Sequence, residues 1–412
     1  MQPVASFRDP IHGFIHADPF EKALIDSRPL QRLRSIRQLG FAHLVFPGAE
    51  HSRFGHVLGA MELAGRVYDA VAIRSDGVLD PDRRSLTRRL VRAAALLHDI
   101  GHAPFSHSAE ELFEGGIDHE QMTGLLLGLA EIERIFDRWG DGIEPKAVLG
   151  LLAKPQGTTQ RLLSQIVSGE LDVDKMDYLL RDSLFCGVQY GSYDLPRLLD
   201  TILPLRDPET GEWGLGVFEG GVHALEALVM ARYYMFTQVY FNPIGKALEL
   251  HFNEWLTEQG HRWPADPEAF LEEDDISVVT AMRQSASPHA RAVIHRQYFP
   301  LAFETREHLT ADEKTRFESL LPHLREQFGS PHILVSRSAK DPHRLGQAGV
   351  LVKRFDGGLE PMEEASHFIR HLARIDRFRV YTPPQIEDQV TATIDELWSR
   401  PESSTDRLQR ET

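Results

Sequence analysis

The sequence predicts a mainly α-helical protein that carries small β-hairpins and ends in a mixed α+β region. Runs rich in helix formers and free of Gly and Pro, such as residues 90–97, indicate buried helices. Turn residues between short apolar segments, at 9–13 and at 207–211, indicate hairpins. Strand-like segments at 349–352 and 378–381 follow a helical stretch near 311–327. The helical pattern therefore dominates, and the sheets are small.

The domain organisation follows from length and from a change in composition. The chain has 412 residues, which is enough for one large domain or two ordinary ones. Between about 258 and 300 the composition becomes polar and contains Pro, which indicates a boundary. We expect a core domain over residues 1–258 and a mixed α/β region over 259–400. The polar residues 401–412 are expected to form a disordered tail.

The first elements are a hairpin and several helices. A hairpin is expected over 7–16, around the sequence Asp-Pro-Ile-His-Gly. Apolar spacing over 19–39 predicts helices interrupted at Pro29. A Pro-Gly turn at 47–48 leads into a buried helix, which places His56 in its first turn.

The central helix through 90–97 is expected to end near Gly101, before Pro104. If it continues that far, His102 lies on the same helical face as His98.

The later elements alternate between helices and one hairpin. Asp118 is a plausible cap of a helix that follows it. Residues 166–183 predict another helix, and 203–222 contain a hairpin. A long helix is expected over 224–250, broken or bent near 242–243.

The composition narrows the functional classes. The formal charge is −16, from 45 Lys and Arg against 61 Asp and Glu, which argues against non-specific binding to nucleic acid or membrane. The single cysteine, Cys186, excludes an intrachain disulfide and a thiolate cluster, which is consistent with a reducing compartment. No apolar run approaches the roughly 18 residues of a membrane helix, and no export signal is visible. We therefore expect a cytoplasmic protein without a membrane anchor.

The most informative stretch covers residues 96–107 and reads Leu-Leu-His-Asp-Ile-Gly-His-Ala-Pro-Phe-Ser-His. His98 and Asp99 fall at the end of an apolar helix, where burial is unfavourable unless they are paired or bind a cation. An isolated pair of this kind more often forms an Asp–His hydrogen bond at a helix end. The additional histidines favour a site for iron, manganese, zinc or magnesium.

Two residues outside this stretch are candidate ligands. Asp174 shares a predicted helix with the apolar stripe around Met176 and Tyr178, which can turn it inward, although a solvated acidic helix face is the alternative. His56 lies in a buried helix, where a lone histidine is more often a satisfied core residue than a ligand.

With these motifs assembled, the chain resembles the HD-domain phosphohydrolases. Within them it is similar to the deoxynucleoside triphosphate triphosphohydrolases, the bacterial relatives of the sterile-alpha-motif-and-HD-domain enzyme. Because the HD motifs begin near residue 9, no sterile-alpha-motif domain is expected. The motifs occur in the expected order over roughly the first three-fifths of the chain. They are the segments 9–13, 31–40, 46–56, 96–107, 118–120, 171–182 and 231–240.

The resemblance implies four metal ligands, which are His56, His98, Asp99 and Asp174. Two imidazoles and two carboxylates suit iron, manganese or zinc and leave positions open for water and a phosphate oxygen. The implied reaction is attack at the α-phosphorus of a deoxynucleoside triphosphate, which gives a deoxynucleoside and tripolyphosphate. Magnesium on the triphosphate is a further expectation.

The resemblance also implies roles for acid–base residues. His107 is expected to protonate the leaving 5′-oxygen, while His102 and His119 hold phosphate and water. Glu120 is expected to orient His119, as carboxylates behind an imidazole commonly do.

Six residues match substrate contacts of the family. Arg53 and Lys175 match contacts to the phosphates; Arg53 is three residues before His56 and Lys175 directly follows Asp174, which fixes each beside the ion where negative charge accumulates. The others match the sugar pocket: Asp182 and Gln38 contact the 3′-hydroxyl, and Tyr178 and Tyr240 form aromatic walls. Tyr240 against the 2′ carbon would leave no room for a ribose hydroxyl.

The resemblance extends to regulation. In the animal relative a guanine nucleotide binds at a subunit interface and drives tetramer assembly. Asp26 and Arg34 match residues that read the guanine edge, and Arg197 matches a contact to the activator phosphates. We therefore expect a homo-oligomer, either a dimer or a tetramer, with a guanine-nucleotide activator. The alternative is that Asp26 and Arg34 belong to an Arg-rich structural helix.

Other functions stay open. Gly55 stands where many relatives have Glu, and Asn242 follows Phe241 where many have His, so the fine shape of the pocket differs from the family pattern. One alternative is another HD-type nucleotide phosphohydrolase or phosphodiesterase. The other is a non-catalytic nucleotide-sensing HD module, which the complete set of matched ligands argues against.

Overall fold

The computed structural model describes residues 3–75, 77–106, 112–153, 157–343 and 349–399. The chain divides into two compact units, each made of segments that are separate in the sequence. The first unit contains Met1–Tyr240, Leu256–Gln284 and Pro342–Leu372. The second contains Phe241–Trp255, Ser285–Asp341 and Ala373–Thr412. The domain limits expected at residues 258 and 400 stay predictions.

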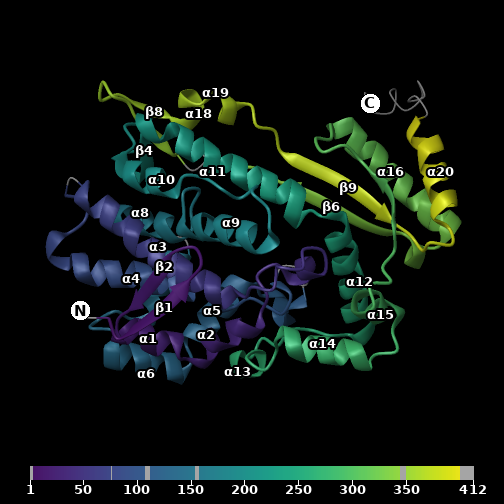
Figure 1. Cartoon of the computed structure of the whole chain (residues 1–412), viewed down its shortest axis with the longest axis horizontal. Helices are drawn as coiled ribbons and strands as arrows, with labels where there is room; N and C mark the ends of the chain where they lie inside the picture. Colours follow the sequence, from purple (N-terminus) through teal and green to yellow (C-terminus); the bar gives the residue numbers. More distant parts are fainter. Residues whose placement is uncertain (1–2, 76, 107–111, 154–156, 344–348, 400–412) are drawn as a thin grey trace. The chain divides into compact units, whose positions relative to one another are not determined.

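The first unit begins with the predicted hairpin. Strands β1 (Ala5–Asp9) and β2 (Gly13–Ala17) pair in an antiparallel register, and Gly13 closes the turn with a φ angle of +78° (Figure 1). Helices α1 (Pro19–Ile25) and α2 (Arg28–Arg32) follow; the predicted interruption is present, but it lies at residues 26–27, and Pro29 belongs to the first turn of α2. Asp18 and Glu21 form a capping box at the start of α1, which explains why the helix begins there.

Three helices carry the candidate site. The long helix α3 (Arg53–Ile73) packs against both α4 (Arg84–Leu97) and α9 (Val173–Cys186), and it is buried over most of its length (Figure 1). Asp172 caps α9 by accepting from the backbone N–H of Lys175 at 2.8 Å. The first turns of α3 and α9 and the last turn of α4 therefore meet in one region.

Helix α4 ends earlier than the sequence predicts. It stops at Leu97, with His98 as the C-cap residue, and does not continue to Gly101. The N–H of Gly101 donates to Thr123 Oγ1 at 3.1 Å, and a Cβ atom at Gly101 would overlap the backbone of α5 (His119–Leu127). Because α5 approaches so closely, the chain turns out of the helix. His102 is therefore not on a shared helical face with His98.

The rest of the first unit consists of shorter elements. Strands β3 (Ile202–Arg206), β4 (Trp213–Phe218), β7 (Leu351–Lys353) and β8 (Leu359–Pro361) form one sheet in that order, with β4 and β7 parallel and the other pairs antiparallel. Helix α11 (Val222–Met235) ends in a π-helical turn, η7 (Phe236–Tyr240). The other described α-helices of this unit are α6 (Ala130–Trp139), α7 (Pro145–Leu152), α8 (Thr158–Val167), α10 (Leu195–Thr201), α13 (Pro267–Phe270), α14 (Asp275–Gln284), α18 (Met362–Ala365) and α19 (His367–Arg370). Its short 3₁₀ turns include η1 (Leu33–Ser35), η2 (Gly40–Leu44), η3 (Pro81–Arg83), η5 (Glu114–Gly116) and η6 (Glu219–Gly221).

The second unit is the mixed α+β region. Its sheet has the order β5 (Leu301–Glu304), β9 (Ile375–Tyr381), β6 (Leu334–Lys340), and all pairs are antiparallel (Figure 1). Helices α16 (Ala311–Phe328) and α20 (Glu387–Ser399) share an apolar core with this sheet. Helices α12 (Pro243–Gln259) and α15 (Pro288–Ile294) and the turn η8 (Ser330–His332) complete the description.

The mainly helical class with small sheets is confirmed. Within the described ranges, no helix combines the length and the apolar character that crossing a membrane requires.

Candidate metal centre

The four predicted metal ligands come from three helix ends. His56 lies in the first turn of α3, His98 caps α4 with Asp99 directly after it, and Asp174 lies in the first turn of α9. Donor atoms of His56, His98 and Asp99 all lie within 4.8 Å of one another. Asp174 Oδ1 lies 3.0 Å from His56 Nε2 and 3.6 Å from His98 Nε2. The structure thus brings all four residues together.

Hydrogen bonds fix which nitrogen of each imidazole faces this cluster. The Nδ1–H of His98 donates to the carbonyl of Ala95 at 2.8 Å, and that of His56 donates to Asp177 Oδ2 at 2.9 Å. The two Nε2 atoms therefore point inward, toward the carboxylates of Asp99 and Asp174. Two inward nitrogens among carboxylate oxygens form a donor set that a cation satisfies.

The electrostatics of the cluster also favour a positive charge. Burial opposes ionisation of His56, but hydrogen bonds with Asp174 and Asp177 raise its pKa to about 10. Burial also opposes ionisation of Asp99, but the charges of Arg53 and the neighbouring histidines hold its pKa well below the usual range. The carboxylates therefore favour a positive charge at the inward nitrogen of His56, which a proton or a bound cation would supply.

Behind His56 lies a buried network that the sequence analysis did not assign. Asp177 accepts from His56 and from His12 Nε2 at 2.7 Å, and it pairs with Arg181 Nε at 2.8 Å. Arg181 also donates to Asp9 Oδ2 at 2.8 Å. All five side chains are buried, or nearly so. The N-terminal hairpin and α9 together therefore orient one predicted ligand.

Signals for this network were present in the sequence. Asp9 and His12 belong to the Asp-Pro-Ile-His-Gly motif, and Asp177 and Arg181 stand four residues apart on α9, which places them on one face. Gly59 on α3 lies directly against them, since a Cβ atom there would overlap the side chains of Asp177 and Arg181. This glycine is therefore required for the close approach of α3 and α9.

A second group of residues surrounds Asp182. Its Oδ1 lies 2.8 Å from His51 Nε2, and its Oδ2 accepts from the hydroxyl of Tyr240 at 2.8 Å. Burial and the charge of Asp182 raise the pKa of Tyr240, so the phenol keeps its proton. The ring of Tyr178 lies between the two groups, 6.5 Å from the His56 ring and 6.2 Å from that of Tyr240.

Gln38 is the remaining residue predicted to contact the sugar. Its side chain is buried, and its Oε1 has no hydrogen-bond partner among the described residues. The backbone N–H of Gln38 donates to the carbonyl of His51 at 3.0 Å, so Gln38 pairs with the residue that contacts Asp182.

The predicted phosphate contacts are basic residues with carboxylate partners. Arg53 forms an ion pair with Asp99 and donates from Nε to Ser106 Oγ at 3.0 Å. Lys175 Nζ lies 2.7 Å from Asp172 Oδ2 and donates to the carbonyl of Gly169 at 2.6 Å. Burial opposes ionisation of Lys175, but the charge of Asp172 raises its pKa to about 12. Both residues therefore stay cationic near the cluster.

Arg232 is a further cation that the sequence analysis did not assign. It lies on α11 within the predicted motif 231–240, it is mostly buried, and it influences the pKa values of both Lys175 and Tyr178. Its Nη1 donates to the carbonyl of Pro342 at 2.9 Å.

The predicted acid–base residues are only partly described. His102 Nδ1 lies 3.3 Å from Asp99 Oδ1, and the rings of His102 and His119 are 4.4 Å apart. Glu120 is exposed and lines a cavity of about 380 Å³ together with Gly169. His107 lies outside the described residues.

The three residues expected to bind an activator are exposed. Asp26 forms an ion pair with Lys22, and Arg34 lies 3.6 Å over the ring of Phe54. Arg197 pairs with Asp200 at 3.0 Å.

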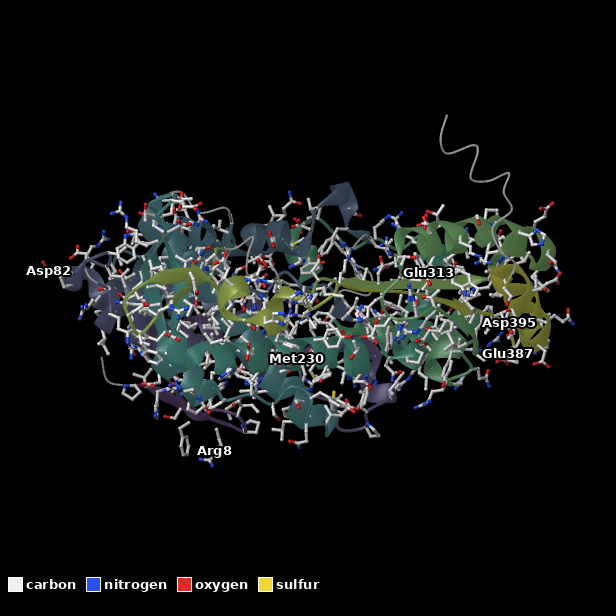
Figure 2. The ribbon with its side chains drawn as sticks, turned by 90° about the horizontal axis from the view of Figure 1, so that it is seen from above. Arg8, Asp82, Met230, Glu313, Glu387 and Asp395 are labelled. Carbon is white, nitrogen blue, oxygen red and sulfur yellow. The ribbon has the colours of Figure 1, made fainter. Side chains whose placement is uncertain are left out.

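Arg8 stands at the outer side of the N-terminal hairpin, where its guanidinium lies 4.7 Å over the ring of Phe14 (Figure 2).

Comparison with known families assigns the region that holds the cluster. A family model for the HD domain matches residues 53–182, and a model for the HD associated region matches residues 204–318. The chain is an HD-domain protein. All four predicted ligands lie inside the HD match, and Tyr240 lies inside the HD-associated match.

Individual relatives agree with this assignment. The uncharacterized protein YwfO of Bacillus subtilis is 39% identical over 272 residues, which are 64% of this chain and 59% of that protein. Human deoxynucleoside triphosphate triphosphohydrolase SAMHD1 is 34% identical over 220 residues, which are 46% of this chain and 34% of that protein. This HD-domain chain thus spans about three-fifths of the length of the bacterial relative and one-third of that of the human enzyme.

Solved structures share the fold over most of the chain. A hypothetical protein from Aquifex aeolicus is 29% identical, with a TM-score of 0.79, and the match covers 94% of this chain and 99% of that one. A phosphohydrolase from Bacteroides thetaiotaomicron is 25% identical, with a TM-score of 0.73, and the match covers 92% of this chain and 99% of that one.

Proposed function

We propose that this chain is a metal-dependent hydrolase that cleaves deoxynucleoside triphosphates to a deoxynucleoside and tripolyphosphate. The observation that carries the proposal is the convergence of two imidazole Nε2 atoms and two carboxylates beside the Arg53 guanidinium. Such a cluster binds a cation, and the adjacent arginine suits a substrate with several negative charges. The SAMHD1 relatives, whose names give this activity, support the choice of substrate.

The metal would be held by His56, His98, Asp99 and Asp174. We propose iron, manganese or zinc in this site, with magnesium on the triphosphate, because mixed imidazole and carboxylate ligands suit these transition metals. When bound, such a metal lowers the pKa of water and polarises a phosphoryl oxygen.

The protein side chains would bind and orient the phosphates. Arg53 is three residues before His56, and Lys175 directly follows Asp174, so these basic side chains would neutralise charge where the phosphates accumulate. His102 is held next to Asp99, and together with His119 it would position phosphate and water. His107 remains the proposed donor of a proton to the leaving 5′-oxygen.

The group around Asp182 would bind the sugar. Asp182 already accepts from Tyr240 and contacts His51, and a carboxylate has lone pairs left for a 3′-hydroxyl. The unpartnered Oε1 of Gln38 is a buried acceptor that a sugar hydroxyl would satisfy. Tyr178 connects this group to the cluster through its ring contacts with His56 and Tyr240. Tyr240 would then pack against the 2′ carbon and exclude a ribose hydroxyl.

Regulation is proposed on the resemblance alone. We propose a homo-oligomer that binds a guanine nucleotide through Asp26, Arg34 and Arg197, whose side chains are exposed. Light scattering with and without a guanine nucleotide tests this part of the proposal.

Product analysis tests the central proposal. The purified chain is incubated with each deoxynucleoside triphosphate and manganese, iron, zinc or magnesium, and the products are separated by anion exchange. Deoxynucleoside together with tripolyphosphate supports the proposal, whereas deoxynucleoside monophosphate as the first product contradicts it.

A matched pair of histidine variants links turnover to the cluster. His98→Ala should abolish turnover and metal content. His223→Ala should leave both intact, since His223 lies on α11 with 94% of its side chain exposed. Equal activity in the two variants would exclude the cluster as the active site.

A further inference from the structure

The loop that follows His98 and Asp99 is held in an unfavourable backbone conformation. Phe105 and Ser106 have φ angles of +56° and +58°, in the left-handed region that residues with a Cβ atom rarely adopt. Neither is a glycine, and they are consecutive. Contacts from other parts of the chain must therefore enforce the conformation.

One carboxylate from a distant segment holds this loop. Asp275 Oδ1 accepts from the backbone N–H of Phe105 at 2.8 Å, and Asp275 Oδ2 accepts from the backbone N–H of Arg37 at 2.9 Å. Asp275 is only 2% exposed. It therefore joins the loop after the predicted ligands to the segment that carries Gln38.

The helix that contains Asp275 does not need this side chain as a cap. Asp275 is the first residue of α14, and the preceding residue, Asp274, accepts from the N–H of Ser277 at 2.8 Å, as an N-cap does. Burial raises the pKa of Asp275 to about 6, although the hydrogen bonds from the backbone N–H groups of Arg37 and Phe105 lower it. These two hydrogen bonds therefore favour the ionised carboxylate that holds the loop.

Other contacts connect the same loop to the cluster. Ser106 Oγ donates to the carbonyl of Arg37 at 3.1 Å and accepts from Arg53, which also pairs with Asp99. Arg32 Nη1 donates to the carbonyl of His102 at 2.9 Å, and its Nε donates to the carbonyl of Glu273 at 2.7 Å. A displacement of Phe105 would therefore be transmitted to His102 and Arg53.

We propose that Asp275, which lies in the HD-associated region, is a positioning residue for the hydrolytic site. Its carboxylate fixes the loop 98–106 against the segment 36–38 and thereby sets the places of His102 and Gln38 relative to the cluster. The hydrogen bonds that its side chain accepts from the described residues come from Phe105 and Arg37, and not from a predicted ligand or a proposed substrate contact. The kinetic part of this inference rests on the proposed function, and the structural part does not.

Two neighbouring substitutions test the inference on the full chain. Asp275→Asn keeps the size of the side chain, but its amide nitrogen cannot accept from a backbone N–H. Asp274→Asn is the matched control, because it changes the adjacent carboxylate, which contacts only its own helix in the hydrogen bonds described. The readouts are kcat, KM, metal content, and hydrogen exchange at the amides of Phe105 and Arg37.

The kinetic expectation is a loss in turnover without a loss of metal. For Asp275→Asn, kcat per metal-loaded site should fall by about 10- to 100-fold, because small displacements of reacting groups have effects of this size. KM should rise less than kcat falls, and metal content should match the wild type. Asp274→Asn should show wild-type kcat and KM. An unchanged kcat in Asp275→Asn would overturn the inference, since a purely structural role alters the folded fraction and not the turnover of each loaded site.

Hydrogen exchange separates this inference from the proposed function. In Asp275→Asn the amide oxygen keeps one of the two hydrogen bonds and the amide nitrogen loses the other, so exchange should accelerate at least about tenfold at Phe105 or at Arg37, and in Asp274→Asn at neither. This result is required even if deoxynucleoside triphosphates are not substrates. If Asp275→Asn does not fold, the wild type still decides: the amide of Phe105 must be protected from exchange, and rapid exchange there would overturn the inference.

Discussion

Substitution of Asp177 tests whether the buried network behind His56 supports metal binding. Asp177→Asn replaces the carboxylate that accepts a hydrogen bond from His56 Nδ1–H with a neutral amide, while Arg181 keeps its contact with Asp9. Loss of a carboxylate behind a metal-bound imidazole typically weakens metal binding by about 10- to 100-fold, or about 1.4 to 2.7 kcal/mol. Asp177 is fully buried and has two further partners, His12 and Arg181, so we expect the upper part of this range.

Metal titration measures this effect directly. Isothermal titration of manganese into metal-free protein should give a Kd for Asp177→Asn near 100 times the wild-type value, while kcat at saturating metal changes far less. A Kd within about twofold of the wild type would refute the reasoning, because it would mean that Asp177 does not orient His56.

Two glycine substitutions on α3 test the same network without changing its charge, one at the network and one as a control. Gly59→Ala would drive a methyl group into Asp177 and Arg181, whereas Gly65→Ala, on the same helix, meets Arg88 Nη2 and Arg92 Nη1 at 2.8 Å. Both changes gain roughly 1 kcal/mol of helix propensity, so their difference reports the contact. We expect weaker metal binding in Gly59→Ala only. Equal Kd values for the two variants would contradict a role of this network.

Three further outcomes are expected. Manganese at about 100 times its Kd should raise the free energy of unfolding by about 2.7 kcal/mol in urea titrations, and His98→Ala should lose this gain; a gain of the same size in the variant would contradict the ligand assignment. Tyr240→Ala should narrow the preference for deoxynucleotides over ribonucleotides at least about tenfold in kcat/KM, because the ring excludes the 2′-hydroxyl sterically; an unchanged ratio would place selectivity elsewhere. In the second unit, the buried His251 accepts from the N–H of Phe299 at 3.0 Å, and burial together with His289 lowers the pKa of His251 to about 4. The folded state therefore resists protonation of His251. The contribution of the neutral His251 to the free energy of unfolding is fully present above pH 6.5, and it is lost as the pH falls toward 4. At pH 5 the loss is about 2 kcal/mol. His251→Gln, whose amide oxygen can still accept, should remove this part of the pH dependence of urea unfolding, and an unaltered dependence would refute the assignment.

Local signals in the sequence were sufficient for several elements outside the ligand cluster. The hairpin at 207–211, the interruption before Pro29 and the cap at Asp118 depend on neighbouring residues, and the structure has all three. The gathering of His56, His98, Asp99 and Asp174 was expected from the motif resemblance, and the structure brings these residues together. Their roles as ligands remain predictions.

Long-range contacts account for what the sequence did not indicate. Helix α4 stops at Leu97, and four residues later Gly101 permits the close approach of α5, but the residues around Gly101 do not indicate which element approaches. Asp177 looks like its acidic neighbours in the sequence, yet its partner His12 lies 165 residues away. The two amides that Asp275 binds are likewise remote, Phe105 being 170 residues earlier. Patterns of local spacing carry no information on such pairs.

The pairing of the N-terminal hairpin with α9 has a consequence for how the protein is made. His12 leaves the ribosome 165 residues before Asp177 does, so at about 5 to 20 residues per second the hairpin waits roughly 8 to 33 seconds for its partner. During that interval Asp9 and His12 remain hydrated, and His56 lacks the carboxylate that orients it. Metal capture on a growing chain should therefore begin only after α9 has emerged. Stalled nascent chains of increasing length can be incubated with radioactive manganese, and the manganese that they retain should increase abruptly once the emerged chain extends beyond Cys186.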